Sequence, residues 1–488
     1  CTLANNPDGT GFSRVYIASD ADIEVPEMPE GLEFVSFVRV FRWEWVSKKG
    51  ICNGGLAAIT NSSWYNDWAA GGATDNPDFE YVPMRHNLGW DSFETINTRN
   101  NVSHVLGYNE PDHTDQANCT PIQAIRQWPE LFKSGLRLGS PTPDAIRKDW
   151  LVKFLELADS LNYRVDFVVG HMYWNGQSGQ NLYNGVVDAC TRLYGGRPMW
   201  ITEWNNGANW TTENWPTNSG PQRDADLNII YDEDGNEKTV TRPLSPENAA
   251  KQATWILDAL NGLERCEYLE RHSLYNWVQD ARAIVLDNKL TPAGKNFAAY
   301  KSKVGFSKAR EYTHTWKIAP PLPSYTLSKD YKSITISWYD HNGETGKNYT
   351  LQKSVDGGEW TDVKVFIAAA DMNPDNPLVY TYGSTISYTE EIDCTSKVDY
   401  RVIALSYKDT QSSYSRTASV TRDAVPDKPI LQGEALSSKI IKLTWSAVDN
   451  ARSYRLERAE SANGEYVEIA NLLTGTTYMD ENLSLIHI

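Results

Sequence analysis

Two short apolar segments of the sequence each end in a glutamate. The first, His104-Val-Leu-Gly-Tyr-Asn-Glu-Pro-Asp112, carries Glu110, and the second, Pro198-Met-Trp-Ile-Thr-Glu-Trp204, carries Glu203. Both are too short for a helix and are bounded by turn-forming residues, so each is predicted to be a strand with its glutamate at the C-terminal end. Two carboxyl groups at the ends of parallel barrel strands could cleave a glycosidic bond, because one can protonate the leaving oxygen while the other attacks or stabilises the anomeric carbon.

The elements that position these glutamates alternate between strand and helix patterns. Strands are predicted at Phe34–Phe41, Ser62–Trp64, Tyr81–Met84, Val105–Asn109, Arg137–Ser140, Phe167–His171, Met199–Glu203 and His272–Trp277. Helices are predicted to open at Pro121, Pro246 and Pro292, and an apolar helix face runs from Trp150 to Leu161. This alternation over residues 34–303 predicts an α/β fold, a (β/α)8 TIM barrel with a parallel sheet.

Six short sequence motifs in this region resemble those of glycoside hydrolase family 128, the β-1,3-glucanases. Asn109-Glu110-Pro111 resembles the acid/base motif that ends the fourth strand of retaining barrel glycosidases, and Trp200-Ile-Thr-Glu-Trp204 resembles their nucleophile strand. The other four motifs occur in the same order as in the family: Ser63-Trp-Tyr-Asn-Asp-Trp68, Tyr81-Val-Pro-Met84, Leu138-Gly-Ser-Pro141 and Val165-Asp-Phe-Val-Val-Gly-His-Met-Tyr-Trp174. The resemblance covers Val35 to Tyr300 and implies an endo-acting, retaining enzyme in which Glu110 is the general acid/base and Glu203 the nucleophile.

Other residues are candidates for substrate binding. By the resemblance, Asn109 would bond the 2-hydroxyl of the sugar being cleaved. His171 and Tyr173 lie two apart on one strand and therefore share a face, so either could orient the nucleophile, with Tyr173 favoured and a core histidine as the alternative. The candidate sugar platforms, for each of which core packing is the competing interpretation, are Trp64, Trp204 and Trp277.

Neither a metal constellation nor a phosphate-cradling glycine loop is recognisable, so no cofactor is expected. Lys48-Lys49 and Arg85-His86 are interpreted as solvated turn charges without a role. Six cysteines without zinc spacing are expected to be mostly free thiols.

Composition narrows the class of partner. The net charge of −17 argues against nucleic acid and anionic membranes, whereas 18 Trp and 26 Tyr suit a neutral polysaccharide. No apolar run approaches the ~20 residues of a membrane helix. We therefore expect a monomer that binds β-1,3-glucan polysaccharide or oligosaccharide and is secreted or held at the cell surface, with lipid anchoring through Cys1 as one option.

The chain is predicted to contain further modules after the barrel. The expected organisation is a lead-in at 1–33, the barrel at 34–303, a linker at 304–323, an immunoglobulin-like fibronectin type III module at 324–423, and a second, C-terminally truncated copy at 427–488. The repeat rests on Trp338 with Tyr349 and on Trp445 with Tyr454, and Tyr400-Arg-Val-Ile-Ala404 has no counterpart in the second copy. The tail Leu483 to Ile488 reads as translated sequencing adaptor. The long connection from Asn205 to Pro243, which follows the Glu203 strand, is expected to lie over the cleft and shape the substrate groove, and within it Ile229 to Val240 predicts a β-hairpin at Asp234-Gly235.

Two rival functions stay open on the sequence alone. A retaining barrel glycosidase acting on another β-glycan, β-1,4 or mixed-linkage, has the same residue chemistry. A non-catalytic surface glycan-binding protein is the second rival, although binding alone does not require two acids on separate strand ends.

Overall fold

The computed structural model describes the chain apart from residues 21, 23–24, 26–27, 33, 73–77, 209–218, 223, 226–227, 242–244, 279–280, 330–331, 372–377, 393–395, 408–409, 413, 421–425, 438, 450, 452, 462 and 482–488. The predicted adaptor tail and Cys394 lie outside the described residues. The other five cysteines are free thiols, as expected. None of the helices in the described ranges is long and apolar enough to span a membrane.

Eight parallel strands form the central barrel. Six pair in the order β6 (Glu80–Tyr81), β5 (Trp64–Asn66), β4 (Lys49–Cys52), β13 (Leu269–Leu274), β10 (Met199–Trp204) and β9 (Val168–Met172). The other two, β7 (His104–Val105) and β8 (Arg137–Leu138), pair with each other. Parallel bridges from Met84 to Leu106 and from Gly139 to Phe167 connect the two groups and close the ring. The predicted α/β fold with a parallel sheet is therefore confirmed.

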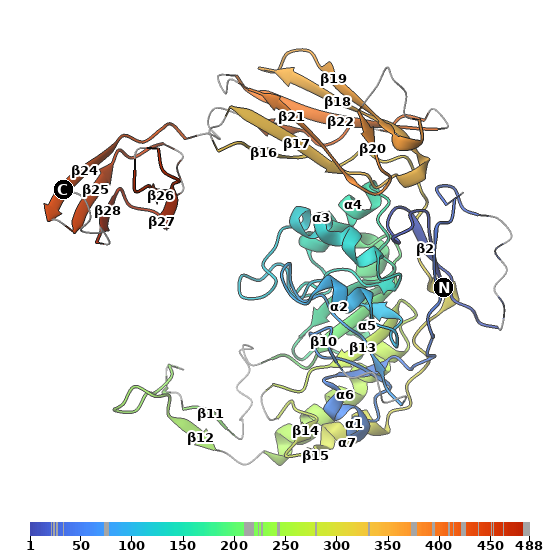
Figure 1. Cartoon of the computed structure of the whole chain (residues 1–488). Coiled ribbons are helices and arrows are strands. Elements are labelled where there is room, and N and C mark those ends of the chain that lie inside the picture. The colour runs from blue at the N-terminus through green and yellow to red at the C-terminus, as the bar shows by residue number, and fades with distance from the viewer. Residues whose placement is uncertain are drawn as a thin grey trace.

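Helices surround this ring (Figure 1). They are α1 (Ala57–Thr60), α2 (Phe93–Asn97), α3 (Pro121–Phe132), α4 (Asp149–Ser160), α5 (Gly179–Asp188), α6 (Pro246–Glu264) and α7 (Pro292–Ala299), with a π-turn at Ala189–Leu193. The predicted starts of α3, α6 and α7 are confirmed, since Thr120, Ser245 and Thr291 cap them and a proline follows each cap. Among the described residues, no helix follows β5 before the chain enters β6.

The prediction that Phe34–Phe41 is the first barrel strand is wrong. Its ordered part, β3 (Phe37–Arg39), pairs antiparallel with β1 (Thr2–Ala4), which also pairs with β2 (Ser13–Val15), in a separate small sheet. The first barrel strand is β4. It begins at Lys49, within the Lys48-Lys49 pair that was interpreted as a solvated turn.

Both lysines are buried because their ammonium groups bind carbonyls at helix ends. Lys49 Nζ donates to the carbonyls of Phe297 and Tyr300, 2.8 and 3.1 Å away, at the end of α7. Lys48 Nζ donates to the carbonyl of Cys266 at 2.7 Å, just beyond α6. These unsatisfied carbonyls carry the negative end of the helix dipole, so a cation there is stabilised in spite of its burial.

Large side chains fill the barrel interior. Trp64, Val82, Met84, Leu106, Phe167, Val169 and Trp200 form one buried cluster. Trp64 and Trp200 lie 5.3 Å apart between ring centroids, and a Cβ on Gly50 would lie 2.3 Å from the Trp64 ring. A glycine in β4 therefore makes the room that this tryptophan occupies.

Two β-rich regions follow the barrel. In the first, β16 (Ser324–Leu327), β17 (Ser333–Tyr339) and β21 (Thr385–Glu391) form one sheet, and β18 (Gly346–Val355), β19 (Thr361–Ala368), β20 (Val379–Tyr380), β22 (Val398–Ser406) and β23 (Ala418–Val420) form another. In the second, β24 (Leu431–Ser437), β25 (Ile440–Trp445) and β28 (Thr477–Asp480) form one sheet, and β26 (Tyr454–Arg458) pairs with β27 (Val467–Leu473).

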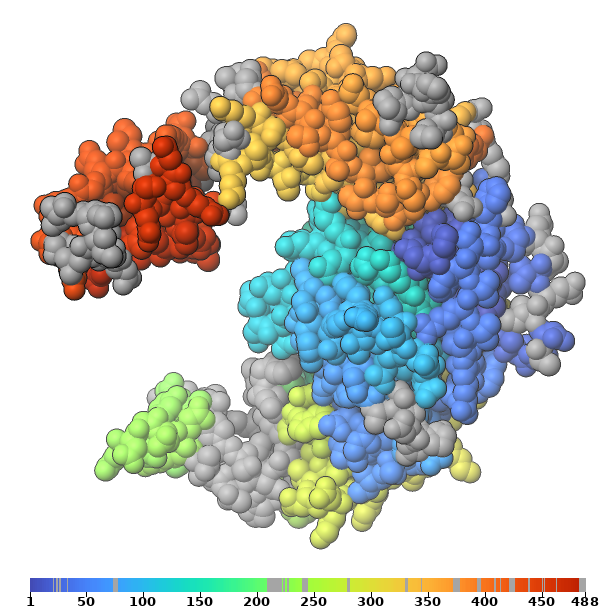
Figure 2. Space-filling model, in the orientation of Figure 1, coloured from blue at the N-terminus to red at the C-terminus, as the bar shows by residue number. Residues whose placement is uncertain are grey.

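The predicted internal repeat corresponds to a repeated contact. The rings of Trp338 and Tyr349 lie 6.2 Å apart, and those of Trp445 and Tyr454 lie 5.5 Å apart, both edge to face. The first β-rich region is seated on the barrel at α3 and α4 (Figures 1 and 2), where Arg126 donates to the carbonyl of Pro323 at 3.0 Å. All-β architecture after the barrel is thus confirmed, and the fibronectin type III assignment stays a prediction.

Two short hairpins complete the described elements. One is β14 (Val285–Leu286) with β15 (Lys289–Leu290), and the other is β11 (Ser219–Pro221) with β12 (Thr239–Thr241). The second continues into an antiparallel bridge between Tyr231 and Glu237, so the hairpin predicted around Asp234-Gly235 is present. Figure 1 shows β11 and β12 projecting away from the barrel.

Candidate active site

A cavity of about 370 Å³ opens at the C-terminal ends of the barrel strands. Its lining residues are Trp68, His86, Asn109, Glu110, Gln116, Tyr173, Glu203, Ala208, Tyr275 and Trp277. They come from the ends of β5, β6, β7, β9, β10 and β13 or from the loops that follow these strands. In parallel barrels this is the end where loops assemble binding and catalytic groups.

The two predicted glutamates meet in this cavity with a histidine between them. Glu110, His171 and Glu203 each present one side-chain atom that lies within 4.8 Å of the other two. The Nδ1 atom of His171 lies 2.9 Å from Glu110 Oε1, and its Nε2 atom lies 3.4 Å from Glu203 Oε1. Residues far apart in the sequence are thus brought to one point, and a single imidazole contacts both carboxylates.

His171 itself is completely buried. Burial lowers the pKa of His171, but the neighbouring carboxylates, Glu203 first and then Glu110, outweigh burial and raise the pKa above its usual value. The raised pKa favours the protonated ring, whose Nδ1 atom is within hydrogen-bond distance of Glu110 and whose Nε2 atom lies 3.4 Å from Glu203. A protonated ring at this position would compensate the negative charge of two carboxyl groups held close together.

Glu203 is held on both oxygens by hydrogen-bond donors. The indole N–H of Trp68 donates to Oε1 at 2.6 Å, and the hydroxyl of Tyr173 donates to Oε2 at 2.7 Å. The side chain of Glu203 is almost buried, and the ladder from β9 to β10 shifts register between Ile201 and Glu203. Such irregularities redirect a side chain, here into the cavity.

Two residues of this group have left-handed backbone conformations. Trp68 has φ +60° and Glu110 has φ +37°. For residues other than glycine this region costs on the order of 1 kcal/mol each. The surroundings maintain it, since the amide of Glu110 donates to Thr142 O at 2.7 Å and the carbonyl of Glu110 accepts from the amide of His113 at 3.0 Å.

Asn109 lies beside the general acid candidate with an unused acceptor. Its Nδ2 group donates to Gln116 Oε1 at 3.3 Å, while its Oδ1 atom is buried without a partner among the described residues. An unpaired buried oxygen is costly, so this atom is a candidate acceptor for a ligand hydroxyl, which it would reach after a small change in the position of the Asn109 side chain.

The structure separates the three predicted tryptophan platforms. Trp277 lines the cavity and is 44 % exposed. Trp64 and Trp204 are buried and cannot reach a sugar, so their interpretation as platforms is wrong. Trp64 fills the barrel interior, and Trp204, next to the inward Glu203, faces outward against α6 and α7, where its ring lies 6.1 Å from that of Trp255 and 6.3 Å from that of Phe297.

Five lining residues are not predicted as site residues by the sequence: Trp68, His86, Gln116, Ala208 and Tyr275. Trp68 lies in one of the six motifs that resemble family 128. His86 belongs to the Arg85-His86 pair, for which the sequence indicates only a solvated turn. The ring of Trp68 lies 5.9 Å from those of both Tyr275 and Trp277, which makes one aromatic wall of the cavity. The predicted hairpin itself contributes none of the lining residues, but the long connection that contains it lines the cavity through Ala208.

The group Glu110, His171 and Glu203 also has the composition of a metal site. Sequence spacing could not indicate this grouping, because the three residues lie on different strands. His171 Nδ1 lies 2.9 Å from Glu110, whereas its Nε2 atom, 3.4 Å from Glu203, makes no hydrogen bond among the described residues.

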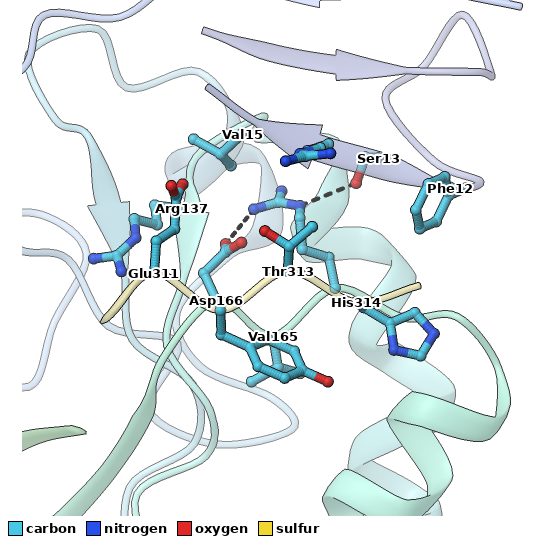
Figure 3. Close-up of a pocket in the computed structure, with 12 residues that line it drawn as sticks. Phe12, Ser13, Val15, Arg137, Val165, Asp166, Glu311, Thr313 and His314 are labelled. Atoms are coloured by element: carbon cyan, nitrogen blue, oxygen red, sulfur yellow. Dashed lines mark hydrogen bonds and ion pairs between the residues drawn. The ribbon is translucent and has the colours of Figure 1, made fainter. Parts of the chain in front are cut away.

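A second hollow, at the other end of the barrel, is too small for a sugar (Figure 3). It holds about 30 Å³ among β2, the segment from Val165 to Asp166 and the segment from Glu311 to His314. Arg164 crosses it, donating to Ser13 Oγ at 3.0 Å and pairing with Asp166. A space of this size accommodates about one water molecule, so we regard it as part of the packing of the N-terminal sheet.

Comparison with known proteins gives one family and several structures. Residues 44–297 match the family model described as glycosyl hydrolase catalytic core. A search of curated proteins finds no match. A family 128, subgroup I endo-β-1,3-glucanase from Amycolatopsis mediterranei, solved with laminaritriose, is 21% identical with a TM-score of 0.40, covering 52% of this chain and 99% of its own.

Two further structures resemble parts of the chain. A family 128, subgroup III curdlan-specific exo-β-1,3-glucanase from Blastomyces gilchristii is 20% identical with a TM-score of 0.36, covering 52% of this chain and 98% of its own. An Fn3-like protein from Clostridium thermocellum is 19% identical with a TM-score of 0.15, covering 21% of this chain and 88% of its own.

Proposed function

Since the chain belongs to the glycosyl hydrolase catalytic core family, we propose that it hydrolyses β-glucan with retention of configuration, using Glu110 as general acid/base and Glu203 as nucleophile. The observation that carries this proposal is the meeting of both carboxyl groups in one open cavity, with oxygens within 4.8 Å of each other. Retaining enzymes hold their carboxyl groups about 5 to 5.5 Å apart, whereas inverting enzymes need roughly 6.5 Å or more to admit a water molecule.

The two steps of the reaction follow from this geometry. In the first, Glu203 attacks the anomeric carbon while Glu110 gives its proton to the leaving oxygen, and a covalent glycosyl-enzyme forms. In the second, Glu110 takes a proton from water, the water oxygen bonds to the anomeric carbon, and Glu203 leaves as a carboxylate. The net result is hydrolysis with the original configuration at the anomeric carbon.

The surrounding side chains hold the reacting groups in place. Trp68 and Tyr173 orient Glu203, since each donates a hydrogen bond to one of its oxygens. Asn109 presents a free carbonyl oxygen to the 2-hydroxyl of the sugar being cleaved. His171 contacts both carboxylates and fixes their separation. Trp277, half exposed at the cavity wall, offers a flat ring to the sugar.

The assignment of the glucan linkage rests on the six sequence motifs that resemble family 128. We propose an endo-acting β-1,3-glucanase, because these motifs occur in the same order as in that family. A polymeric substrate implies action outside the cell, and we expect the enzyme to work as a monomer. The fibronectin type III-like modules would serve as spacers or as weak glucan binders.

Two experiments on the wild-type chain test the class and the linkage. Incubation with laminarin and with a mixed-linkage glucan should release reducing sugars from both, with β-1,3 bonds cleaved. Proton NMR of the first products should show the β-anomer before mutarotation. Products from β-1,4 substrates alone would favour a related glycosidase, no products from any β-glucan would favour a binding protein, and the α-anomer would overturn retention.

A matched pair of variants tests the nucleophile. Glu203→Gln should abolish turnover and leave glucan binding intact, because the amide keeps the shape but cannot attack. Glu247→Gln on α6 is the control, since Glu247 is exposed, pairs with Lys251 and is not among the residues that line the cavity. Near wild-type rates for Glu203→Gln would show that another residue is the nucleophile.

A further inference from the structure

One large ring near the cavity stands out because it is exposed. Trp90 has 46 % of its surface accessible, although it is among the largest apolar side chains. Its ring centroid lies 5.0 Å from that of His86, and His86 lines the cavity. Trp90 does not itself line the cavity, so its ring lies outside the cavity wall, in contact with His86.

The loop that carries Trp90 is held in shape by its own hydrogen bonds. The Oδ1 atom of Asn87 accepts from the amides of Gly89 and Trp90, both at 2.8 Å. The amide of Asn87 donates to the carbonyl of Trp90 at 2.8 Å, which closes the turn. The ring is therefore presented by an ordered loop, and little conformational entropy is lost when a ligand packs on it.

Further hydrogen bonds connect this loop to the segments that carry Trp68 and Glu110. The Oδ2 atom of Asp91 accepts from the amide of Ala70 at 2.6 Å, and Ala70 lies in the loop that carries Trp68. On the other side, the carbonyl of His86 accepts from the amide of Asn109 at 2.8 Å. Trp90 thus has a defined position relative to both sides of the cleavage site.

The size of the cavity requires binding beyond it. A volume of about 370 Å³ is at the low end of small-molecule pockets. It accommodates only a short part of a polysaccharide, so the rest of the chain must cross the rim. Exposed aromatic rings suit the C–H faces of sugars, and a neutral ligand is not repelled by a protein of net charge −17.

We propose that Trp90 is an outer sugar-binding platform of this enzyme, on which a glucosyl unit stacks beyond the units held inside the cavity. This inference rests on the proposed glucan hydrolysis and adds the place where the substrate leaves the cavity. It predicts a dependence on substrate length, because only oligosaccharides long enough to reach Trp90 gain from the ring.

The test compares three tryptophan variants on laminari-oligosaccharides of increasing length. Trp90→Leu keeps an apolar side chain without a flat ring, and Trp90→Phe restores a ring. Trp45→Leu is the matched control, since Trp45 is 49 % exposed but precedes β4 at the opposite end of the barrel. KM and kcat are measured for each length, with melting temperatures to verify folding. If Trp90→Leu does not fold, Trp90→Ala provides the same comparison.

For long oligosaccharides, Trp90→Leu should raise KM about tenfold, equivalent to about 1.4 kcal/mol, with a change in kcat below about twofold. For the shortest cleaved oligosaccharide KM should stay unchanged, and Trp90→Phe should recover most of the affinity. An unchanged KM at every length, an equal rise at every length, or the same loss in Trp45→Leu would overturn the proposal. If wild type cleaves no β-glucan, the proposed function fails, which is a different outcome from cleavage without length dependence.

Discussion

Replacing Trp68 by phenylalanine is the sharpest test of how Glu203, the proposed nucleophile, is held. The change removes the indole N–H that donates to Glu203 Oε1 at 2.6 Å. It keeps an aromatic ring beside Tyr275 and Trp277, each 5.9 Å away between ring centroids. The perturbation is thus close to the deletion of one hydrogen bond to a carboxylate.

The expected magnitude follows from the geometry around Glu203. A hydrogen bond to a charged group contributes about 1.5 to 3 kcal/mol. Part of this is recovered, because Tyr173 still holds Oε2 at 2.7 Å and water in the open cavity can replace the lost donor. Misplacement of the attacking oxygen adds to the loss in the transition state. We therefore expect kcat to fall about 10- to 100-fold, or about 1.4 to 2.7 kcal/mol.

The assay is steady-state hydrolysis of laminarin, with kcat and KM determined separately. KM should change less than about threefold, since the ring at the cavity wall remains. Trp150→Phe is the control, because it also deletes an indole hydrogen bond, to Cys119 O at 2.8 Å, but Trp150 lies on α4 and is not among the residues that line the cavity. That variant should lose some thermal stability and keep the wild-type kcat.

Three outcomes would refute the reasoning about Trp68. A kcat above half of the wild-type value would mean that the hydrogen bond does not position Glu203. A rise in KM with unchanged kcat would make Trp68 a substrate contact only. An equal fall of kcat in Trp150→Phe would show that loss of stability, and not of orientation, explains the effect.

Further predictions concern the acid and two buried charges. Glu110→Ala should lose most of its kcat/KM on laminarin but keep much of the kcat/KM on aryl glucosides with a dinitrophenolate leaving group, because kcat/KM reports the first step and this leaving group needs no proton; equal losses of kcat/KM on both would exclude Glu110 as the acid. Burial raises the pKa of Glu80, but Arg271 and then His104 outweigh burial and lower it to about 2. The stability from this charge is present above pH ~4.5 and is lost as pH falls toward 2, by up to about 3 kcal/mol. Glu80→Gln should therefore melt lower than wild type at pH 6, and this gap should narrow at pH 3; a constant gap would contradict the pairing. The pKa of His171 is raised, so its stabilising charge is fully present below pH ~6.5 and is lost as pH rises through the folded pKa; the melting-temperature gap between wild type and His171→Asn should shrink at alkaline pH.

Local patterns were enough to predict several elements. Thr120, Ser245 and Thr291 each precede a proline and an apolar periodic run, and each caps a helix in the structure. The edge-to-face pairs of Trp338 with Tyr349 and of Trp445 with Tyr454 were anticipated by the repeat. These features depend on residues close in sequence, whose preferences decide the local conformation.

The sequence predictions are wrong at residues whose burial depends on groups far away in the sequence. Lys48 and Lys49 are buried at the barrel wall because carbonyls at the ends of α6 and α7 accept hydrogen bonds from their ammonium groups. Trp64 and Trp204 occupy strand ends, but the alternation of side chains and the barrel closure bury both rings. No pattern within a few residues contains the carbonyls or the opposing strands that decide these positions.

The sequence by itself determined that the chain alternates strands and helices and then becomes all-β, because periodicity and capping act over short distances. It also placed Glu203 at the end of a strand, β10, whereas β7 ends at Val105 and Glu110 lies in the segment that follows it. Only the tertiary structure decided that these carboxyl groups meet, that His171 lies between them, and that Trp68 and Tyr173 hold Glu203. The physical reason is barrel closure. A ring of parallel strands converts separations of many residues into contacts of a few ångströms, and it also chooses which neighbouring side chain faces the cavity and which faces the core.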